Sequence, residues 1–219
     1  MKKDKLFIAS FINNILVFLL VLVGVIVMIT AGDGELAEKN ITVFKYFTFQ
    51  SNVFMGVVAS IYAYYQLLML LGKKDKIPHV LLVFNHVGVT AVGLTFLIVI
   101  LFLAPGYGFD KMYNNANLFF HALVPLVAMI NYLFFEKECA IRFKEATCAV
   151  IPPTLYGIVY FIVVASQNAY GNIKIDFYMF GSNGPVVGAF NFLAIVSIAY
   201  GIGLLLFFIN YLIFKKRKD

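Results

Sequence analysis

Charged side chains are scarce in this 219-residue chain, at 13% of the sequence, whereas hydrophobic residues reach 62%. A soluble domain is about 25% charged, because its surface needs groups that water solvates. The scarcity of charge therefore excludes a soluble enzyme, a nucleic-acid-binding module and a disordered tail. With a mean hydropathy of +0.91, most of the chain is expected to lie in lipid.

Cysteine is also scarce, and the two cysteines of the sequence are Cys139 and Cys148. Both fall on or near the expected cytoplasmic side, where thiols stay reduced, so no disulfide is expected. Internal repeats and low-complexity linkers are absent as well. Residues 1–219 are therefore interpreted as a single membrane domain.

Long uncharged runs are what the sequence does have, and a helix crosses the hydrocarbon core in about 20 residues. Six such runs predict an all-α polytopic membrane protein, a six-transmembrane-helix bundle with helices at residues 6–30, 44–71, 79–103, 113–135, 146–166 and 186–214. The last run would be too long for one span without the turn-forming cluster at residues 181–185. The first run is too long for the apolar region of a signal peptide, so it is interpreted as a true helix.

Basic residues are distributed unevenly over the loops. The N-terminus, the C-terminus and the loops near residues 73–76 and 137–144 hold 13 of the 17 Lys and Arg residues. Because cytoplasmic loops are enriched in Lys and Arg, both termini are expected to be cytoplasmic. The loops at residues 33–40, 104–112 and 167–185 then face outward. The net charge of +6 has the same explanation and does not indicate nucleic acid.

Acidic residues are absent from all six predicted spans, which weakens the case for a proton-coupled transporter with a buried carboxylate relay. The helix at 113–135 instead carries a polar stripe of Asn114, Asn117 and His121, which continues to Pro125 on the same face. Pro125 lacks an N–H and crowds the carbonyl of His121, so the helix is expected to loosen there. A kink that serves packing is the alternative interpretation.

Thr48, Asn52 and Gly56 share one face of the helix at 44–71. Thr48 lies four residues inside the outer end of its span and His121 seven residues inside its own. At about 1.5 Å per residue, the two differ in depth by about 4–5 Å, which allows a hydrogen bond if the faces meet. An imidazole can take the proton of a threonine hydroxyl and make it a nucleophile. Alternatively, the Thr48 hydroxyl bonds the preceding turn of its own helix.

Several polar side chains could assist such chemistry by binding the substrate or an oxyanion. The candidates are Gln50, Asn52, Asn117, Tyr156 and Asn191. A metal site would need about three ligands at one depth. His79 and His86 lie in the inner half and His121 in the outer half, so no metal and no cofactor are expected, and His86 is interpreted as structural.

Three segments resemble a known family. Residues 46–52 (YFTFQSN) resemble the "YFT-x-QSN" opening of helix 2, and residues 117–125 (NLFFHALVP) resemble an "N-x(2)-LH-x(3)-P" segment. Residues 153–156 (PTLY) resemble a "P-x(2)-Y" segment at helix 5. These motifs, their order and the six-helix layout are similar to bacterial members of the FAR-17a and androgen-induced-gene family. The chain departs from the family at Phe120, where the motif has leucine, and at residues 173–178, which replace an aromatic, proline-rich "YPYPF" segment.

The resemblance implies an activity, because animal members of this family are integral-membrane threonine hydrolases. They cleave fatty acid esters of hydroxy fatty acids with a Thr and a His, and the matching positions here are Thr48 and His121. The expected function is thus lipid ester hydrolysis in a bacterial plasma membrane, with a fatty acid ester as substrate and with no cofactor or nucleic acid. The alternatives are a small transporter or channel and a non-catalytic lipid-binding membrane protein.

Overall fold

The computed structural model describes residues 5–31, 40–136 and 141–216. Within these ranges it is all-helical, and six of its helices are long and apolar enough to cross a membrane. The predicted fold class is thereby confirmed. The bounds of the six spans differ from the predicted ones by at most four residues. Cys148 is free, and Cys139 lies outside the described residues.

The described residues form fifteen elements, because several spans are divided into α, 3₁₀ and π segments and two short elements, η1 and α5, lie between spans. In chain order these are α1 (Lys5–Thr30), η1 (Asn40–Lys45), α2 (Phe47–Leu70), α3 (His79–Ile98), η2 (Val99–Leu103), α4 (Ala104–Tyr107), α5 (Phe109–Met112), α6 (Ala116–Leu118), η3 (Phe119–Leu123), α7 (Val124–Ile130), η4 (Asn131–Phe135), α8 (Phe143–Ala146), η5 (Thr147–Val150), α9 (Ile151–Ser166) and α10 (Pro185–Lys216).

Proline punctuates these helices in the way its chemistry dictates. It fixes φ and lacks an N–H, so it is tolerated where a helix begins. Pro78 directly precedes α3, Pro152 lies in the first turn of α9, and Pro185 opens α10 at the end of the expected break, residues 181–185. In lipid each backbone polar group must be satisfied within the segment, which is why uncharged runs of this length become helices.

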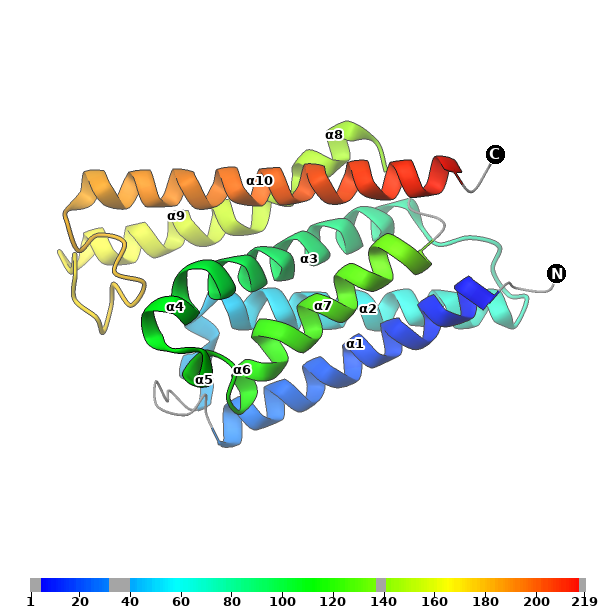
Figure 1. Cartoon of the computed structure of the whole chain (residues 1–219), viewed down its shortest axis with the longest axis horizontal. Coiled ribbons are helices and arrows are strands. Elements are labelled where there is room, and N and C mark those ends of the chain that lie inside the picture. The colour runs from blue at the N-terminus through cyan, green and yellow to red at the C-terminus, as the bar shows by residue number, and fades with distance from the viewer. Residues whose placement is uncertain (1–4, 32–39, 137–140, 217–219) are drawn as a thin grey trace.

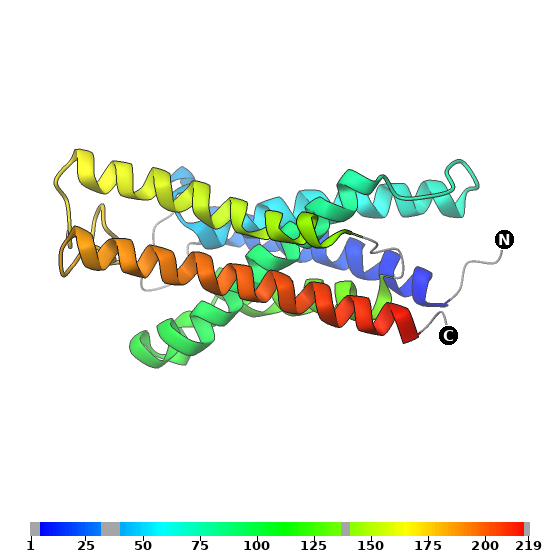
Figure 2. The same cartoon turned by 90° about the horizontal axis from the view of Figure 1, so that it is seen from above.

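The central helix of the bundle is α3. It contacts α2, α7 and α10, and the side chains from Asn85 to Thr95 are all buried. In Figure 1, α9 and α10 lie on one side of α3, and α1, α2 and α7 lie on the other. Figure 2 shows the same bundle from above, with the beginning of α1 and the end of α10 together at one end.

Helices α1 and α2 pack closely because small residues face the partner helix. A Cβ on Gly56 would lie 2.7 Å from Cγ1 of Val21, and a Cβ on Gly24 would lie 2.7 Å from Cε1 of Phe120. Such close approach is how helices associate in lipid, where apolar burial alone gives little driving force. The contacts hold α1 beside both α2 and the helix that carries His121.

Candidate functional site

The turn that carries His121 is π-helical over Phe119–Leu123. A proline cannot donate to the preceding turn, and π turns are one way in which a helix absorbs that defect, often at functional sites. The loosening expected ahead of Pro125 is thus confirmed. His121 is buried, and its Nδ1 lies 2.6 Å from the carbonyl oxygen of Met112. Because a carbonyl can only accept, Nδ1 carries the proton, and Nε2 holds the lone pair that a general base needs.

Asn52 joins α2 to this π turn. Its Nδ2 donates to the carbonyl of Thr48 at 2.8 Å and to the carbonyl of Phe120 at 3.2 Å. In the π register an N–H bonds the carbonyl five residues earlier, so Phe120 holds the carbonyl that Pro125 cannot serve. The Asn52 amide therefore replaces the missing proline donor. Its own Oδ1 is buried without a partner.

Thr48 lies half-buried in the first turn of α2. Ser51 and Asn52 lie one turn further along α2. The Ser51 hydroxyl lies 3.3 Å from that of Thr95 on α3, whereas the Asn52 amide donates to the carbonyl of Phe120. Residues at i, i+3 and i+4 share a helix face, so Thr48 faces the seam between α3 and the π turn. Among the described residues no hydrogen bond joins its hydroxyl to His121.

The remaining predicted polar side chains mostly bond to backbone carbonyls nearby. Asn117 donates to Lys111 at 3.3 Å, Gln50 to Phe44 at 2.6 Å and Asn191 to Phe180 at 3.3 Å. The Tyr156 hydroxyl donates to the carbonyl of Lys45 at 2.6 Å. The structure thus brings Asn52 and Asn117 to the helix turns near His121, and Gln50 and Tyr156 to the other side of α2, where a cavity lies.

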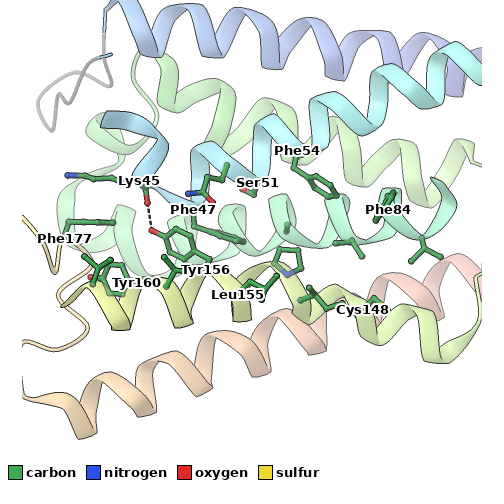
Figure 3. A pocket seen from close by; sticks show the side chains of 18 of the residues that line it. Lys45, Phe47, Ser51, Phe54, Phe84, Cys148, Leu155, Tyr156, Tyr160 and Phe177 are labelled. Carbon is green, nitrogen blue, oxygen red and sulfur yellow. Dashed lines mark hydrogen bonds between the residues drawn. The ribbon is translucent and has the colours of Figure 1, made fainter. Parts of the chain in front are cut away.

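This cavity has a volume of about 750 Å³ and lies between α2, α3 and α9 (Figure 3). Apolar side chains such as Phe54, Phe84 and Leu155 form most of its wall, and Cys148 lines it near the beginning of α9. Its polar groups gather where α2 begins, in a set that comprises Lys45, Gln50, Ser51, Tyr156 and Tyr160. Neither Thr48 nor His121 is among the lining residues, although Thr48 is the next residue after Phe47, which is one of them.

The shape and chemistry of this cavity suit an acyl chain. A long apolar wall with a few polar groups at one end is the usual form of a site for an amphiphilic molecule. Comparison with protein-family models, curated proteins and solved structures finds no match.

The loop that contains Asp176 borders the polar end of the cavity. The sequence analysis did not identify Asp176 as a buried residue. The fully buried carboxylate accepts the hydroxyl of Tyr160 and the backbone N–H groups of Gly171, Phe180 and Gly181. Four donors satisfy one carboxylate, which explains how an acid lies buried here without a cation. Four aromatic rings pack against one another beside it, in stacked, edge-to-face and tilted pairs: Tyr156, Tyr160, Phe177 and Tyr178. Burial raises the pKa of Tyr178 to about 12.

A second buried acid, Glu136, was also missed, because it directly follows the fourth uncharged run. Its side chain is 4% exposed. Asn85 donates to one carboxylate oxygen at 2.5 Å and Asn131 to the other at 2.8 Å. Burial raises the pKa of Glu136 to about 8, against the opposing effect of hydrogen bonds from Asn85 and Asn14. Asn85 and Asn131 both lie within apolar helices. These isolated polar residues were the sequence signal that could have indicated a buried polar partner.

His86 lies close to this second acid but has a partner of its own. Its Nδ1 is 2.8 Å from the hydroxyl of Tyr132, and both side chains are fully buried. Among the described residues, no group of three His, Cys, Asp or Glu side chains could hold a metal ion together. This geometry gives His86 a packing and hydrogen-bonding role between α3 and η4.

Proposed function

We propose that this chain is an intramembrane lipid ester hydrolase in which Thr48 is the nucleophile and His121 the general base. The observation that carries the proposal is the double hydrogen bond of Asn52, which ties the turn bearing Thr48 to the turn bearing His121. The bond from His121 Nδ1 to Met112 adds to it, because it leaves Nε2 as the acceptor.

The proposed reaction proceeds in two steps. His121 Nε2 takes the proton of the Thr48 hydroxyl while the oxygen attacks the ester carbonyl carbon, and the imidazolium then protonates the departing alkoxide. Water, deprotonated by the same ring, attacks the carbonyl of the acyl-threonine, the bond to the Thr48 oxygen breaks, and the imidazolium returns its proton to that oxygen as the fatty acid is released. The hydroxyl and the ring share no hydrogen bond in this structure, so bound ester must bring them together, as catalytic contacts often tighten only in the substrate complex.

The cavity beside α2 supports the choice of substrate class in this proposal. It is apolar along α9 and polar where α2 begins, so the acyl chain would lie along α9 and the ester would lie near Gln50 and Tyr156. We propose a neutral fatty acid ester, such as an ester of a hydroxy fatty acid. We further propose a bacterial plasma membrane as its location, which the resemblance to bacterial family members supports. Both termini are proposed to be cytoplasmic, because the loops on their side hold most of the Lys and Arg residues.

The decisive experiment uses the purified full chain in detergent. Labelling by a fluorophosphonate probe and turnover of a branched fatty acid ester are compared for wild type, Thr48→Ala and His121→Ala. Both signals should disappear in both variants. Ser60→Ala is the matched control, because this hydroxyl on the same helix bonds only its own backbone, to Val57 at 2.8 Å. Turnover that survives Thr48→Ala would remove Thr48 from its role.

A second candidate function, lipid binding without turnover, is favoured by one observation. The walls of the cavity include neither Thr48 nor His121. On this alternative, native mass spectrometry finds lipid bound to the purified chain, no ester is cleaved, and Thr48→Ala leaves the bound lipid unchanged.

A further inference from the structure

The oxyanion donors that the sequence predicted are already engaged in the structure. Attack on an ester carbonyl leaves a negative charge on its oxygen, and hydrogen-bond donors aimed at that oxygen stabilise it. The amide side chains and one hydroxyl predicted for this role donate to backbone carbonyls, and they belong to Gln50, Asn52, Asn117, Asn191 and Tyr156. A donor that is not already bonded would serve the oxyanion better.

Tyr113 carries such a donor. Its hydroxyl oxygen is buried and has no hydrogen-bond partner among the described residues. The other buried side-chain atoms in that condition are amide oxygens and one imidazole nitrogen, so this is the one such hydroxyl in the described part of the chain. Burial raises the pKa of the hydroxyl above its ordinary value, so it keeps its proton at neutral pH. A buried polar group without a partner calls for an explanation, and a ligand that accepts its hydrogen bond is one.

Tyr113 lies beside the proposed base. The centroids of its ring and the His121 ring are 6.4 Å apart, and the two rings are perpendicular. The preceding residue, Met112, provides the carbonyl oxygen that lies 2.6 Å from His121 Nδ1. The Tyr113 ring also stacks on Phe109, with 6.1 Å between centroids. One short stretch of backbone therefore orients the imidazole and places the unpaired hydroxyl next to it.

Thr48 faces the same region from α2. Helices α2 and α3 run in opposite directions (Figure 1), and the hydroxyls of Ser51 and Thr95 lie 3.3 Å apart between them. Thr48 lies one turn before the first of these residues and Val99 one turn after the second, so Thr48 and Val99 are at the same level of the seam. Tyr113 packs against the buried cluster that contains Val99. The proposed nucleophile, the base and the unpaired hydroxyl thus converge at one end of the seam between α2 and α3.

The cavity reaches this seam at Ser51, which is one of its lining residues. Ser51 and Thr48 are three residues apart, or about 4.5 Å along α2. An ester at the polar end of the cavity therefore lies within about one helix turn of the nucleophile. Its carbonyl oxygen can point towards α3, on the side where Tyr113 packs.

We propose that Tyr113 is a catalytic residue of this hydrolase, and that its hydroxyl binds the oxyanion of the tetrahedral intermediate. The inference rests on the proposed function, because no oxyanion forms without attack by Thr48. As the Thr48 oxygen bonds to the carbonyl carbon, the π electrons of the C=O bond move to the carbonyl oxygen, which accepts the hydrogen bond. When the alkoxide departs, these electrons form the C=O bond again. Tyr113 keeps its proton throughout, and His121 carries the proton that is transferred.

The test compares ester turnover and thermal unfolding of the purified full chain in wild type and Tyr113→Phe. This change keeps the ring and removes a hydroxyl that has no partner, so the unfolding temperature should stay the same or rise. The value of kcat should fall by about a hundredfold, with little change in KM. Tyr107→Phe is the matched control, because it removes a hydroxyl from a side chain in α4 that is 52% exposed, and it should leave kcat unchanged.

Two inhibitors separate binding of the oxyanion from binding of the chain. A long-chain trifluoromethyl ketone forms an adduct with the nucleophile that carries the same oxyanion, so its affinity should fall in Tyr113→Phe by about the same factor as kcat/KM. The corresponding long-chain ether has no carbonyl and should bind both proteins equally. Equal losses of affinity for the ketone and the ether would indicate a structural role and overturn the proposal.

The outcomes distinguish this proposal from the proposed function. If Thr48→Ala is inactive and Tyr113→Phe keeps kcat within about threefold of the wild type, Tyr113 is not the donor and the proposed function stands. Turnover that survives Thr48→Ala, or a wild type that cleaves no ester, would overturn both. If Tyr113→Phe does not fold, Tyr113→Met takes its place, since it fills similar space without a hydroxyl, and the same limits apply to its kcat.

Discussion

Asn52 and Phe120 are joined across two helices by a hydrogen bond that compensates for a proline. The Asn52 amide donates at 3.2 Å to the carbonyl that lies five residues before Pro125, where the backbone has no N–H to offer. A defect in one span is thereby repaired by a side chain of another. The same bond sets the distance between the helix turn of Thr48 and that of His121, so stability and the candidate chemistry depend on one amide.

Asn52→Ala should destabilise the fold by about 1–3 kcal/mol, because it leaves the Phe120 carbonyl buried without a donor. Pro125→Ala restores an N–H to the helix, so the same Asn52 change should cost less in that background. Unfolding by detergent titration of the four proteins gives the coupling energy, which we expect to be about 1 kcal/mol. If the destabilising effects of the two substitutions simply add, Asn52 does not compensate for the N–H that Pro125 lacks.

Leu155→Trp tests the role of the cavity. Leu155 lines the cavity from α9, and its side chain is 60% exposed, so a larger ring can be added from the rim without displacing the core. We expect turnover of long-chain esters to fall by about tenfold relative to turnover of short-chain esters. If the protein binds lipid without turnover, the amount of bound lipid should fall by a similar factor. Ile162→Trp is the control, because Ile162 lies on the same helix, is 62% exposed and does not line the cavity. Equal effects of the two changes would argue against the cavity as the acyl site.

Asp176→Ala should loosen the loop at residues 167–184. The carboxylate accepts the hydroxyl of Tyr160 and three backbone N–H groups, and its loss leaves buried donors unpaired at a cost of about 1–3 kcal/mol for each bond to a charged group. Hydrogen exchange of the loop amides measures the effect. Asp110→Ala, at an exposed position, should leave exchange in residues 167–184 as it is in the wild type.

Glu136 should make folding stability depend on pH. Its pKa is raised from 4.5 to about 8 in the folded chain, chiefly by burial, so the folded state binds a proton that the unfolded state has released. Stability should therefore fall as the pH rises from about 4.5 to about 8 and then level off. The difference in unfolding temperature between wild type and Glu136→Gln isolates this contribution. Parallel pH profiles for the two proteins would contradict it.

The six spans follow from the sequence because lipid imposes one strong rule, that a spanning segment is an uncharged helix. The π turn ahead of Pro125 follows from the chemistry of one residue. Whether the faces that carry Thr48 and His121 meet depends on helix rotation and packing, and a similar depth in the membrane does not determine these. The sequence could suggest that Thr48 and His121 lie near each other, and the structure adds Asn52 as their connection.

The cavity and the two buried acids were beyond sequence reasoning for a different reason. The cavity exists because α9 does not pack tightly against α2. No local sequence pattern predicts such a tertiary arrangement. Asp176 and Glu136 lie outside the uncharged runs, in segments that hydropathy assigns to water. Each is buried because neighbouring side chains or loop amides surround it, which requires contacts between residues far apart in the chain.

The spans of this bundle differ in apolar length, and the surrounding bilayer must respond to that difference. The last span, Pro185–Ile213, has 29 residues and is about 44 Å long, whereas the fourth, Ala116–Phe135, has 20 residues, two of its turns are π-helical, and it reaches no more than about 30 Å. The hydrocarbon core is about 30 Å thick, so α10 must tilt or thicken the membrane locally. A thicker membrane would let α10 stand more upright, and a thinner one would force it to tilt further against α3, so the packing of α10 responds to the thickness of the membrane that contains it.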